Sequence, residues 1–345
     1  MTLWLLLPTL VLVAWILTGQ LRRYALAKNI IDVPNARSSH SIPTPRGGGV
    51  AIVLSYLLTI PLLATFDIIG WRECWTILGA GGGVAVLGFL DDHGHIAARW
   101  RLLGHFSAAA WVLYFVGGMP PLVILNFELE LGWVGHCLGI FYIVWLLNLY
   151  NFMDGIDGLA GVEAVFVCAG GALLYVLLGY PQNIWVLLTL GCTVLGFLIW
   201  NLPPARIFMG DAGSGFLGIS LAALTLQAAW VNPVLLPAWL ILLGVFVVDA
   251  TLTLIRRLLR GEKVYEAHRS HAYQFASRHY GSHLPVTVAV LLINLLWLLP
   301  LAVAVSLNLV EGWIGLIIAY VPLGVLAIRF QAGQAEISHA DSLKR

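Results

Sequence analysis

Charged side chains are scarce in this sequence: Asp, Glu, Lys and Arg make up only 10% of its 345 residues, whereas soluble domains carry about 25%. This scarcity excludes a disordered chain and an ordinary soluble globule. The formal net charge is +1, so there is no overall basic surface, and we expect no nucleic-acid partner. The four cysteines show no CxxC spacing, which argues against a zinc site or a disulfide framework.

Long apolar runs take the place of the missing charge, since 60% of the residues are hydrophobic and the mean hydropathy is +0.91. A membrane-spanning helix needs about 20 mostly apolar residues. Candidate spans occupy residues 2–20, 47–66, 74–90, 102–118, 134–150, 158–178, 184–200, 213–229, 234–255, 285–306 and 312–330. The predicted fold class is therefore all-α, a polytopic integral membrane protein with about eleven transmembrane helices.

The distribution of the few cations tests this topology, because cytoplasmic loops of membrane proteins are enriched in Lys and Arg. With eleven spans and the N-terminus outside, every Lys and Arg except Arg72 falls at the inner side. The two longest polar segments, 21–46 and 256–284, also lie inside. We predict one transmembrane domain over residues 1–330 and a cytoplasmic tail over 331–345.

Five aspartates fall at the inner ends of predicted spans, in three separate loops: Asp91, Asp92, Asp154, Asp157 and Asp211. Clustered carboxylates repel one another unless a cation lies among them. Their oxygens suit Mg²⁺ or Mn²⁺, which commonly bridge to substrate phosphates, while nearby Arg and Lys bind the remaining phosphate charge. The pattern indicates a polyphosphate substrate that reacts at the cytoplasmic membrane surface. Any single aspartate could instead cap a helix, as Asp211 could.

Other polar residues near these aspartates are candidates for the same site. Asn151 precedes Asp154 by three residues and could present a neutral oxygen to a metal, whereas Asn148 could equally bond a neighbouring helix. The glycine-rich stretch 208–215 opens a helix, which is typical of a phosphate cradle.

Four histidines lie in the basic inner loop 256–284. For His268 and His271 we favour phosphate or nucleotide contacts over zinc, and we interpret His279 and His283 as solvated. Glu163 and Asp249 lie inside predicted spans. Helix-to-helix hydrogen bonds are favoured there over a proton relay.

Three motifs occur in a fixed order: Gly88-Phe-Leu-Asp-Asp92, Asn151-Phe-Met-Asp-Gly-Ile-Asp-Gly-Leu-Ala160 and Phe208-Met-Gly-Asp-Ala-Gly-Ser214. Together they resemble the polyprenyl-phosphate N-acetylhexosamine-1-phosphate transferases, glycosyltransferase family 4. The resemblance covers about residues 1–330. The stretch from Asp32 to Gly49 resembles WbpL-type members, which start O-antigen units in Gram-negative bacteria.

The resemblance implies a reaction and a role for each motif. A lipid phosphate attacks the β-phosphate of a UDP-linked N-acetylated sugar, and UMP leaves. One member of the pair Asp91 and Asp92 deprotonates or positions the lipid phosphate, Asn151 and Asp211 hold Mg²⁺, and Asp154 and Asp157 are catalytic residues next to the nucleotide. The substrate-binding residues are expected to be His40, Arg46, Asn148, Arg206, His268, Arg269 and His271. Many relatives carry a tighter histidine cluster in the last loop than this chain does.

The expected partners are a UDP-N-acetylated sugar, undecaprenyl phosphate and the lipid bilayer, with the active site on the cytoplasmic side of the bacterial inner membrane. The sequence leaves open the identity of the sugar, Mn²⁺ in place of Mg²⁺, and a homodimer. Two other functions are alternatives. A secondary transporter would bind its substrate near the midplane between repeated halves, and an intramembrane aspartyl protease would need an Asp pair inside the bilayer.

Overall fold

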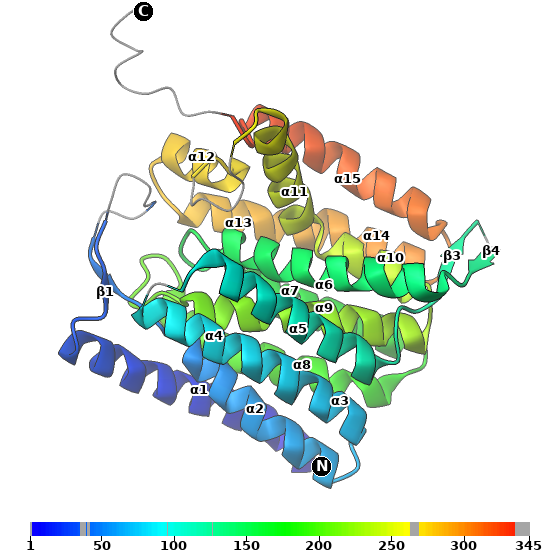
Figure 1. Cartoon of the computed structure of the whole chain (residues 1–345), viewed down its shortest axis with the longest axis horizontal. Coiled ribbons are helices and arrows are strands. Elements are labelled where there is room, and N and C mark those ends of the chain that lie inside the picture. Colours follow the sequence, from blue (N-terminus) through cyan, green and yellow to red (C-terminus); the bar gives the residue numbers. More distant parts are fainter. Residues whose placement is uncertain are drawn as a thin grey trace, which may run out of the picture.

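The structure is a computed structural model, and it describes residues 2–34, 39, 42–94, 96–125, 127–262 and 269–334. These residues form a helical bundle with a two-stranded antiparallel hairpin at each end (Figure 1). At one end Ile31 of β1 lies opposite Pro45 of β2. At the other end Leu122 of β3 lies opposite Leu129 of β4.

The first part of the chain holds α1 (Thr2–Ala27), β1 (Ile31–Asp32), β2 (Thr44–Pro45), α2 (Val50–Thr65), α3 (Trp71–Thr76), the π-helical turn η1 (Ile77–Gly81), α4 (Gly82–His93), α5 (Ala98–Val116), β3 (Leu122–Ile124), β4 (Phe127–Leu129) and α6 (Gly132–Met153). The second part holds α7 (Leu159–Leu177), the 3₁₀ turn η2 (Pro181–Asn183), α8 (Ile184–Asn201), α9 (Asp211–Val231), α10 (Leu235–Leu242), α11 (Gly244–Leu259), α12 (Ala272–Tyr280), α13 (Leu284–Ile293), the π-helical turn η3 (Asn294–Leu298), α14 (Leu299–Ser306) and α15 (Gly312–Arg329).

Each of the eleven predicted spans coincides with one helix or with consecutive helices. Among the described residues, eight segments are long and apolar enough to cross a membrane, and the pair α10 and α11 would make a ninth. The other two, α2 and α5, are helical, but α2 has only 16 residues and α5 begins with Arg99 and Arg101. The all-α polytopic prediction is confirmed, while the count of eleven and the orientation stay predictions. The predicted tail lies outside the described residues from 335 onward.

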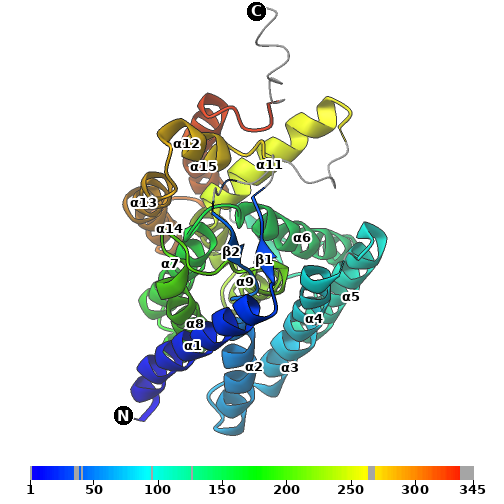
Figure 2. The same ribbon diagram turned by 90° about the vertical axis from the view of Figure 1, so that its left-hand side faces the viewer.

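The predicted span 234–255 is not straight. Helices α10 and α11 meet at Leu243 and are bent by 75°. Figure 2 shows α11 pointing away from the bundle. The end of α11 carries Arg256 and Arg257. Because charged heads are costly inside a bilayer, a turn toward the surface is favourable for them.

Helix α9 lies at the centre of the bundle, and 83% of the residues in its apolar 18-residue stretch are buried. Its small residues allow this, because neighbouring backbones come very close to it. A Cβ on Gly218 would lie 2.8 Å from the Cα of Leu147, and one on Gly213 would lie 2.6 Å from the Cα of Gly49. Gly81 packs in the same way, since its Cβ would lie 2.7 Å from the ring of Phe216.

The start of α9 is covered by the segment that leads into α2. The backbone N–H of Gly48 donates to the carbonyl of Phe208 at 2.8 Å, and that of Gly49 donates to the carbonyl of Met209 at 2.9 Å. The predicted span 47–66 placed Gly49 inside a helix. The structure places it in a turn before α2, which begins at Val50. In Figure 2, which looks at this end of the bundle, β1 and β2 lie in front of α9.

Candidate active site

The predicted aspartates of two separate motifs meet at the first turn of α9. The carboxylate of Asp92, at the end of α4, accepts the backbone N–H of Asp211 at 3.1 Å and that of Ala212 at 3.3 Å. These are the unpaired donors of a helix N-terminus, where a negative charge is favourable. Asp211 was predicted as a possible cap. The structure corrects this: Asp92 caps α9, while Asp211 is the first residue of the helix.

Two glycines make this meeting sterically possible. A Cβ on Gly88 would lie 2.5 Å from the backbone carbonyl of Asp211, so α4 could not approach α9 with a larger residue there. Gly210 has φ +79°, in the left-handed region that favours glycine. Its Cβ would also lie 2.7 Å from Oδ2 of Asp92. The glycines of the motifs therefore set the distance between the two aspartates.

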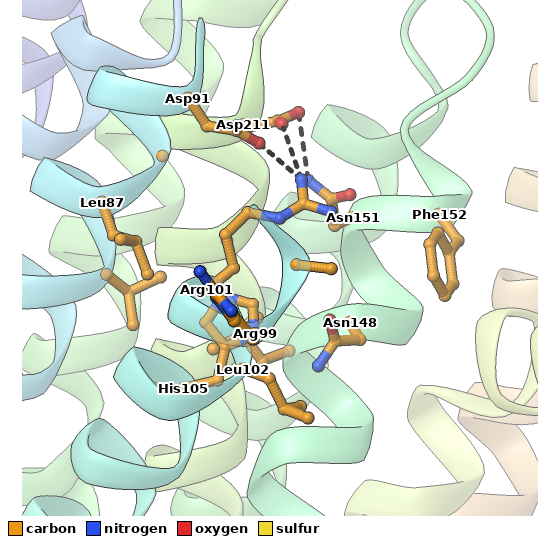
Figure 3. Close-up of a pocket in the computed structure, with 15 residues that line it drawn as sticks. Leu87, Asp91, Arg99, Arg101, Leu102, His105, Asn148, Asn151, Phe152 and Asp211 are labelled. Atoms are coloured by element: carbon orange, nitrogen blue, oxygen red, sulfur yellow. Dashed lines mark hydrogen bonds and ion pairs between the residues drawn. The ribbon is translucent and has the colours of Figure 1, made fainter. Parts of the chain in front are cut away.

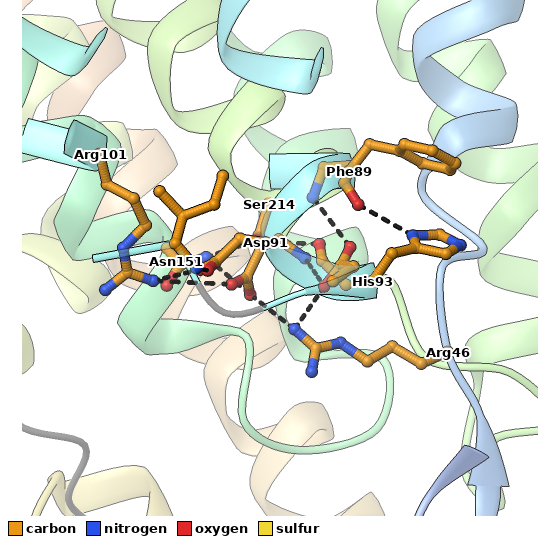
Figure 4. Close-up of polar contacts among 12 residues, drawn as sticks. Arg46, Phe89, Asp91, His93, Arg101, Asn151 and Ser214 are labelled. Carbon is orange, nitrogen blue, oxygen red and sulfur yellow. Dashed lines mark hydrogen bonds and ion pairs between the residues drawn. The ribbon is translucent and has the colours of Figure 1, made fainter. Parts of the chain in front are cut away.

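Two arginines neutralise the carboxylate cluster. Arg46 forms an ion pair with Asp92, and its guanidinium lies 3.2 Å from Oδ1 of Asp211 (Figure 4). Burial opposes the charge of Arg46, but Asp211 and Asp92 outweigh it, so the pKa of Arg46 is raised. Arg101 contacts Asp91 at 2.5 Å and lies 4.0 Å from Oδ2 of Asp211. Arg46 is remote from these aspartates in sequence, and Arg101 was not among the residues predicted for the site.

Asn151, near the end of α6, contacts the same aspartate. Its Nδ2 donates to Oδ1 of Asp211 at 3.3 Å and to Oγ of Ser214 at 2.8 Å. The two residues predicted to hold a metal are thus neighbours, although they lie 60 residues apart in sequence. Asn148 donates to the carbonyl of Val144 on its own helix at 2.7 Å.

The loop after α6 carries the other two aspartates. Burial raises the pKa of Asp154, and the nearby Asp211 raises it further, so Asp154 binds a proton more readily than an ordinary aspartate. Oδ2 of Asp157 accepts the backbone N–H of Ala205 at 2.9 Å. Tyr273 of α12 fixes this loop by donating its hydroxyl to the carbonyl of Phe152 at 2.8 Å.

Two cavities meet at Asp211. The first, of about 340 Å³, lies between α4, α5, α6 and α9, and we call it the apolar cavity (Figure 3). It is lined by Val84, Leu87, Gly88, Asp91, Ala98, Arg99, Arg101, Leu102, His105, Leu147, Asn148, Asn151, Phe152, Asp211 and Gly215. The second, of about 360 Å³, we call the polar cavity. It is lined by Asp32, Ser39, Arg46, Asp154, Gly155, Ile156, Asp157, Asn201, Phe208, Gly210, Asp211, Gln274 and His283. Among these lining residues only Asp211 belongs to both cavities.

Some predicted substrate-binding residues lie elsewhere. Arg206 is exposed, and its guanidinium lies 5.8 Å from the centre of the Trp200 ring, so it lines neither cavity. His271 is only 2% exposed and stacks on Tyr273 with ring centres 5.6 Å apart. Arg269 likewise lines neither cavity. His40 and His268 lie outside the described residues.

Comparison with known proteins agrees with this geometry. A family model described as "Glycosyl transferase family 4" matches residues 74–229, which hold all three motifs. A probable undecaprenyl-phosphate N-acetylglucosaminyl 1-phosphate transferase of Bacillus subtilis is 30% identical over 89% of this chain and 85% of its own length. A decaprenyl-phosphate N-acetylglucosaminephosphotransferase of Mycobacterium tuberculosis is 29% identical over 82% of this chain and 78% of its own length. A phospho-N-acetylmuramoyl-pentapeptide-transferase of a Hydrogenobaculum species is 31% identical over 68% of this chain and 72% of its own length.

The chain belongs to the polyprenyl-phosphate N-acetylhexosamine-1-phosphate transferases. It is thus a multi-pass membrane enzyme whose family joins a sugar phosphate to a polyprenyl phosphate. Both alternatives fit less well. The aspartates of this transferase gather at one end of the bundle, and not at the midplane that a transporter uses. The cluster is also paired with arginines, unlike the proton-sharing Asp pair of a protease.

Two residues of the transferase site differ from the prediction made from the sequence. Ser214 was quoted in a motif but not assigned a role, although it accepts from Asn151. His283 was interpreted as a solvated loop histidine, which is wrong, because it lies at the start of α13 with Nδ1 3.1 Å from Oδ1 of Asp157. Burial opposes its charge, but the hydrogen bond to Asp157, the negative charge of Asp157 and the hydrogen bond to Ser39 together outweigh burial, so the pKa of His283 is raised.

The two carboxylates expected in helix-to-helix bonds do form them. Glu163 of α7 accepts from Nδ2 of Asn294 at 2.7 Å. Asp249 of α11 accepts the backbone N–H of Ala272 at 2.9 Å and that of Tyr273 at 3.0 Å, so it caps α12. Their partners indicate structural roles.

Proposed function

We propose that this chain transfers an N-acetylhexosamine 1-phosphate from a UDP-sugar to undecaprenyl phosphate and releases UMP. The proposal depends above all on one observation: a carboxylate, Asp211, lines both a mainly apolar cavity and a polar one. A reaction between a water-soluble donor and a lipid acceptor needs two such compartments that share one point. Phosphoryl transfer needs positioning and charge neutralisation more than covalent chemistry from the protein.

The apolar cavity suits the phosphate end of the lipid acceptor. Leu87, Leu102 and Phe152 offer apolar contacts to the first isoprene units, while Arg99 and Arg101 supply guanidinium groups for the phosphate (Figure 3). Because a phosphate monoester is already mostly ionised at neutral pH, the acceptor needs little help from a base. Asp91 lines this cavity, whereas Asp92 is engaged in capping α9. Of the pair, Asp91 is therefore the one that faces the acceptor.

The polar cavity suits the UDP-sugar. Arg46 faces Asp211 from its side and can bind the donor diphosphate in exchange for its present carboxylate partners. In the transfer, an oxygen of the acceptor phosphate forms a bond to the β-phosphorus of the donor. The bond between that phosphorus and the oxygen bridging it to the α-phosphate breaks, and UMP carries away the electron pair.

The residues around Asp211 fit a divalent cation. Nδ2 of Asn151 is engaged by Ser214 and Asp211, which leaves its carbonyl oxygen as a hard donor beside the Asp211 carboxylate. No group of three or more His, Cys, Asp or Glu side chains suited to a metal occurs in the described part of the chain. Asn151 and Asp211 would therefore hold Mg²⁺, or Mn²⁺, together with substrate phosphate oxygens and water. The ion would neutralise charge on the transferred phosphate.

We further place this activity at the cytoplasmic side of a bacterial inner membrane, as the first membrane step of O-antigen synthesis in lipopolysaccharide. The location is supported by the basic residues of the inner loops, because the predicted topology places them on the same side of the membrane as the aspartate cluster. The pathway is supported by the WbpL-like stretch from Asp32 to Gly49, of which Arg46 belongs to the site.

The test is an assay of purified protein in detergent with undecaprenyl phosphate and a panel of UDP-sugars of the N-acetylglucosamine, N-acetylfucosamine and N-acetylquinovosamine types. We expect UMP and a lipid-linked sugar diphosphate in equal amounts with one donor, and loss of both when EDTA is added. Release of UMP that does not depend on undecaprenyl phosphate, or no release with any donor, would contradict the proposal.

A further inference from the structure

His283 connects two parts of the chain that are far apart in sequence. Its Nδ1 lies 3.1 Å from Oδ1 of Asp157, and the backbone N–H of Asp157 lies 3.3 Å from the same nitrogen. Its Nε2 lies 3.0 Å from the backbone carbonyl oxygen of Ser39. The side chain is only 14% exposed, so these contacts are largely screened from water.

Asp157 is held on its other sides as well. Its Oδ2 accepts the backbone N–H of Ala205 at 2.9 Å, and its carbonyl accepts from Oγ1 of Thr287 at 2.9 Å. Thr287 lies one turn after His283 on α13, so one helix end holds both the side chain and the backbone of Asp157. The orientation of the Asp157 carboxylate is thereby fixed by the fold and not by solvent.

The pair of His283 and Asp157 also forms part of a wall. Both residues line the polar cavity and a neighbouring cavity of about 560 Å³, whose lining includes Pro203 and Arg278. The charged groups that line the two cavities with His283 are Asp32, Arg46, Asp154, Asp157, Asp211 and Arg278. A shift of this pair would therefore change the shape of the polar cavity directly.

We propose that His283 is a positioning residue of the donor site, whose imidazole fixes the Asp157 carboxylate and with it the wall of the cavity that receives the UDP-sugar. The inference rests on the proposed function, because it takes the polar cavity as the donor site. A histidine is suited to this task, since its two ring nitrogens reach partners on opposite sides. A glutamine at this position can reach only one of them with a donor group.

The raised pKa of His283 gives the inference a second readout. The imidazolium form donates Nδ1–H to the carboxylate, and this contact is present at low pH. As the pH rises through the pKa of His283, Nδ1 loses its proton and can only accept, as from the backbone N–H of Asp157. The Asp157 carboxylate then loses its donor. We therefore expect donor binding to weaken over the same pH range.

The experiment compares the unmodified protein with His283→Gln, using His279→Gln as the matched control, because His279 is exposed and lines none of the three cavities named here. We expect His283→Gln to raise the KM for the UDP-sugar about tenfold, with kcat and the KM for undecaprenyl phosphate within about twofold. His279→Gln should leave all three unchanged. An unchanged donor KM in His283→Gln, or a fall in kcat alone, would overturn the inference.

A pH series completes the test. The ratio of kcat/KM for the donor between the unmodified protein and His283→Gln should be largest at acid pH and fall toward one as the pH rises, whereas a constant ratio would overturn the inference. If His283→Gln does not accumulate, the KM of the unmodified protein for the UDP-sugar tests the inference instead. This KM should rise with pH, and a KM that does not change with pH would overturn the inference. If the unmodified protein is active and has the same KM for the UDP-sugar as His283→Gln, only this inference is overturned. If the unmodified protein releases no UMP, the proposed function is overturned as well.

Discussion

Carboxylates in two regions of the bundle have different kinds of partners. Glu163, fully buried between α7 and η3, accepts from the neutral amide of Asn294. Asp211, with a side chain 29% exposed, faces Arg46 and Arg101 and lines two cavities. A neutral partner inside the bundle stabilises packing, whereas a cation at an open site can exchange its carboxylate for a substrate phosphate. The partners, and not the carboxylates alone, therefore indicate where chemistry takes place.

The largest expected effect is that of Asp211→Asn. The change keeps the shape of the side chain but removes the charge shared by both cavities, so we expect UMP release to fall at least about 100-fold. Membrane insertion and the elution volume in detergent should stay unchanged. Activity close to that of the unmodified protein would place the reaction away from Asp211.

Asp92→Asn should be the next most severe change. It removes one of the two carboxylate partners of Arg46 and weakens the cap of α9; loss of a helix cap costs about 1 kcal/mol. We expect transfer to fall about 30-fold, together with a lower melting temperature in detergent. Loss of activity without any change in melting temperature would contradict the capping role of Asp92.

Arg101→Gln should act on one substrate only. Because Arg101 lines the apolar cavity, the KM for undecaprenyl phosphate should rise about tenfold while the KM for the UDP-sugar stays constant. Arg23→Gln is the matched control, since Arg23 is exposed on α1. A change in the donor KM would mean that the two cavities are assigned the wrong way round.

Asp249→Asn should have the smallest effect on transfer. Asp249 caps α12 through two backbone N–H groups, and an amide retains one acceptor, so we expect a loss of about 1 kcal/mol in stability. The thermal midpoint measures this loss, and the UMP assay should show activity much closer to normal than in Asp211→Asn. An inactive but stable Asp249→Asn protein would move the chemistry toward α11.

The helices and the acidic motifs could be predicted from the sequence because both are local patterns. Apolar runs identify spans, and Asp92, Asn151 and Asp211 each belong to a short motif at the end of a helix. The predicted topology places the helix ends that carry these motifs on the same side of the membrane, so their convergence could be expected. The structure shows these three residues around the start of α9.

The residues that complete the site could not be predicted in this way. Arg46 reaches Asp92 only because the backbone of Gly48 and Gly49 pairs with the segment before α9, and no local pattern specifies that pairing. His283 reaches Asp157 across 126 residues. Arg206 was expected to bind substrate, but its guanidinium lies over the Trp200 ring and it lines neither cavity. Long-range packing decides these contacts.

The central claim is that the lipid and the nucleotide sugar occupy different cavities that meet at Asp211, and photo-crosslinking tests it most directly. A photoreactive amino acid would be placed at Leu102 in the apolar cavity or at Phe208 in the polar cavity. We predict that the Leu102 position labels undecaprenyl phosphate and not the UDP-sugar, and that the Phe208 position labels the UDP-sugar and not the lipid. Labelling of both substrates from one position, or the reverse pattern, would contradict the account.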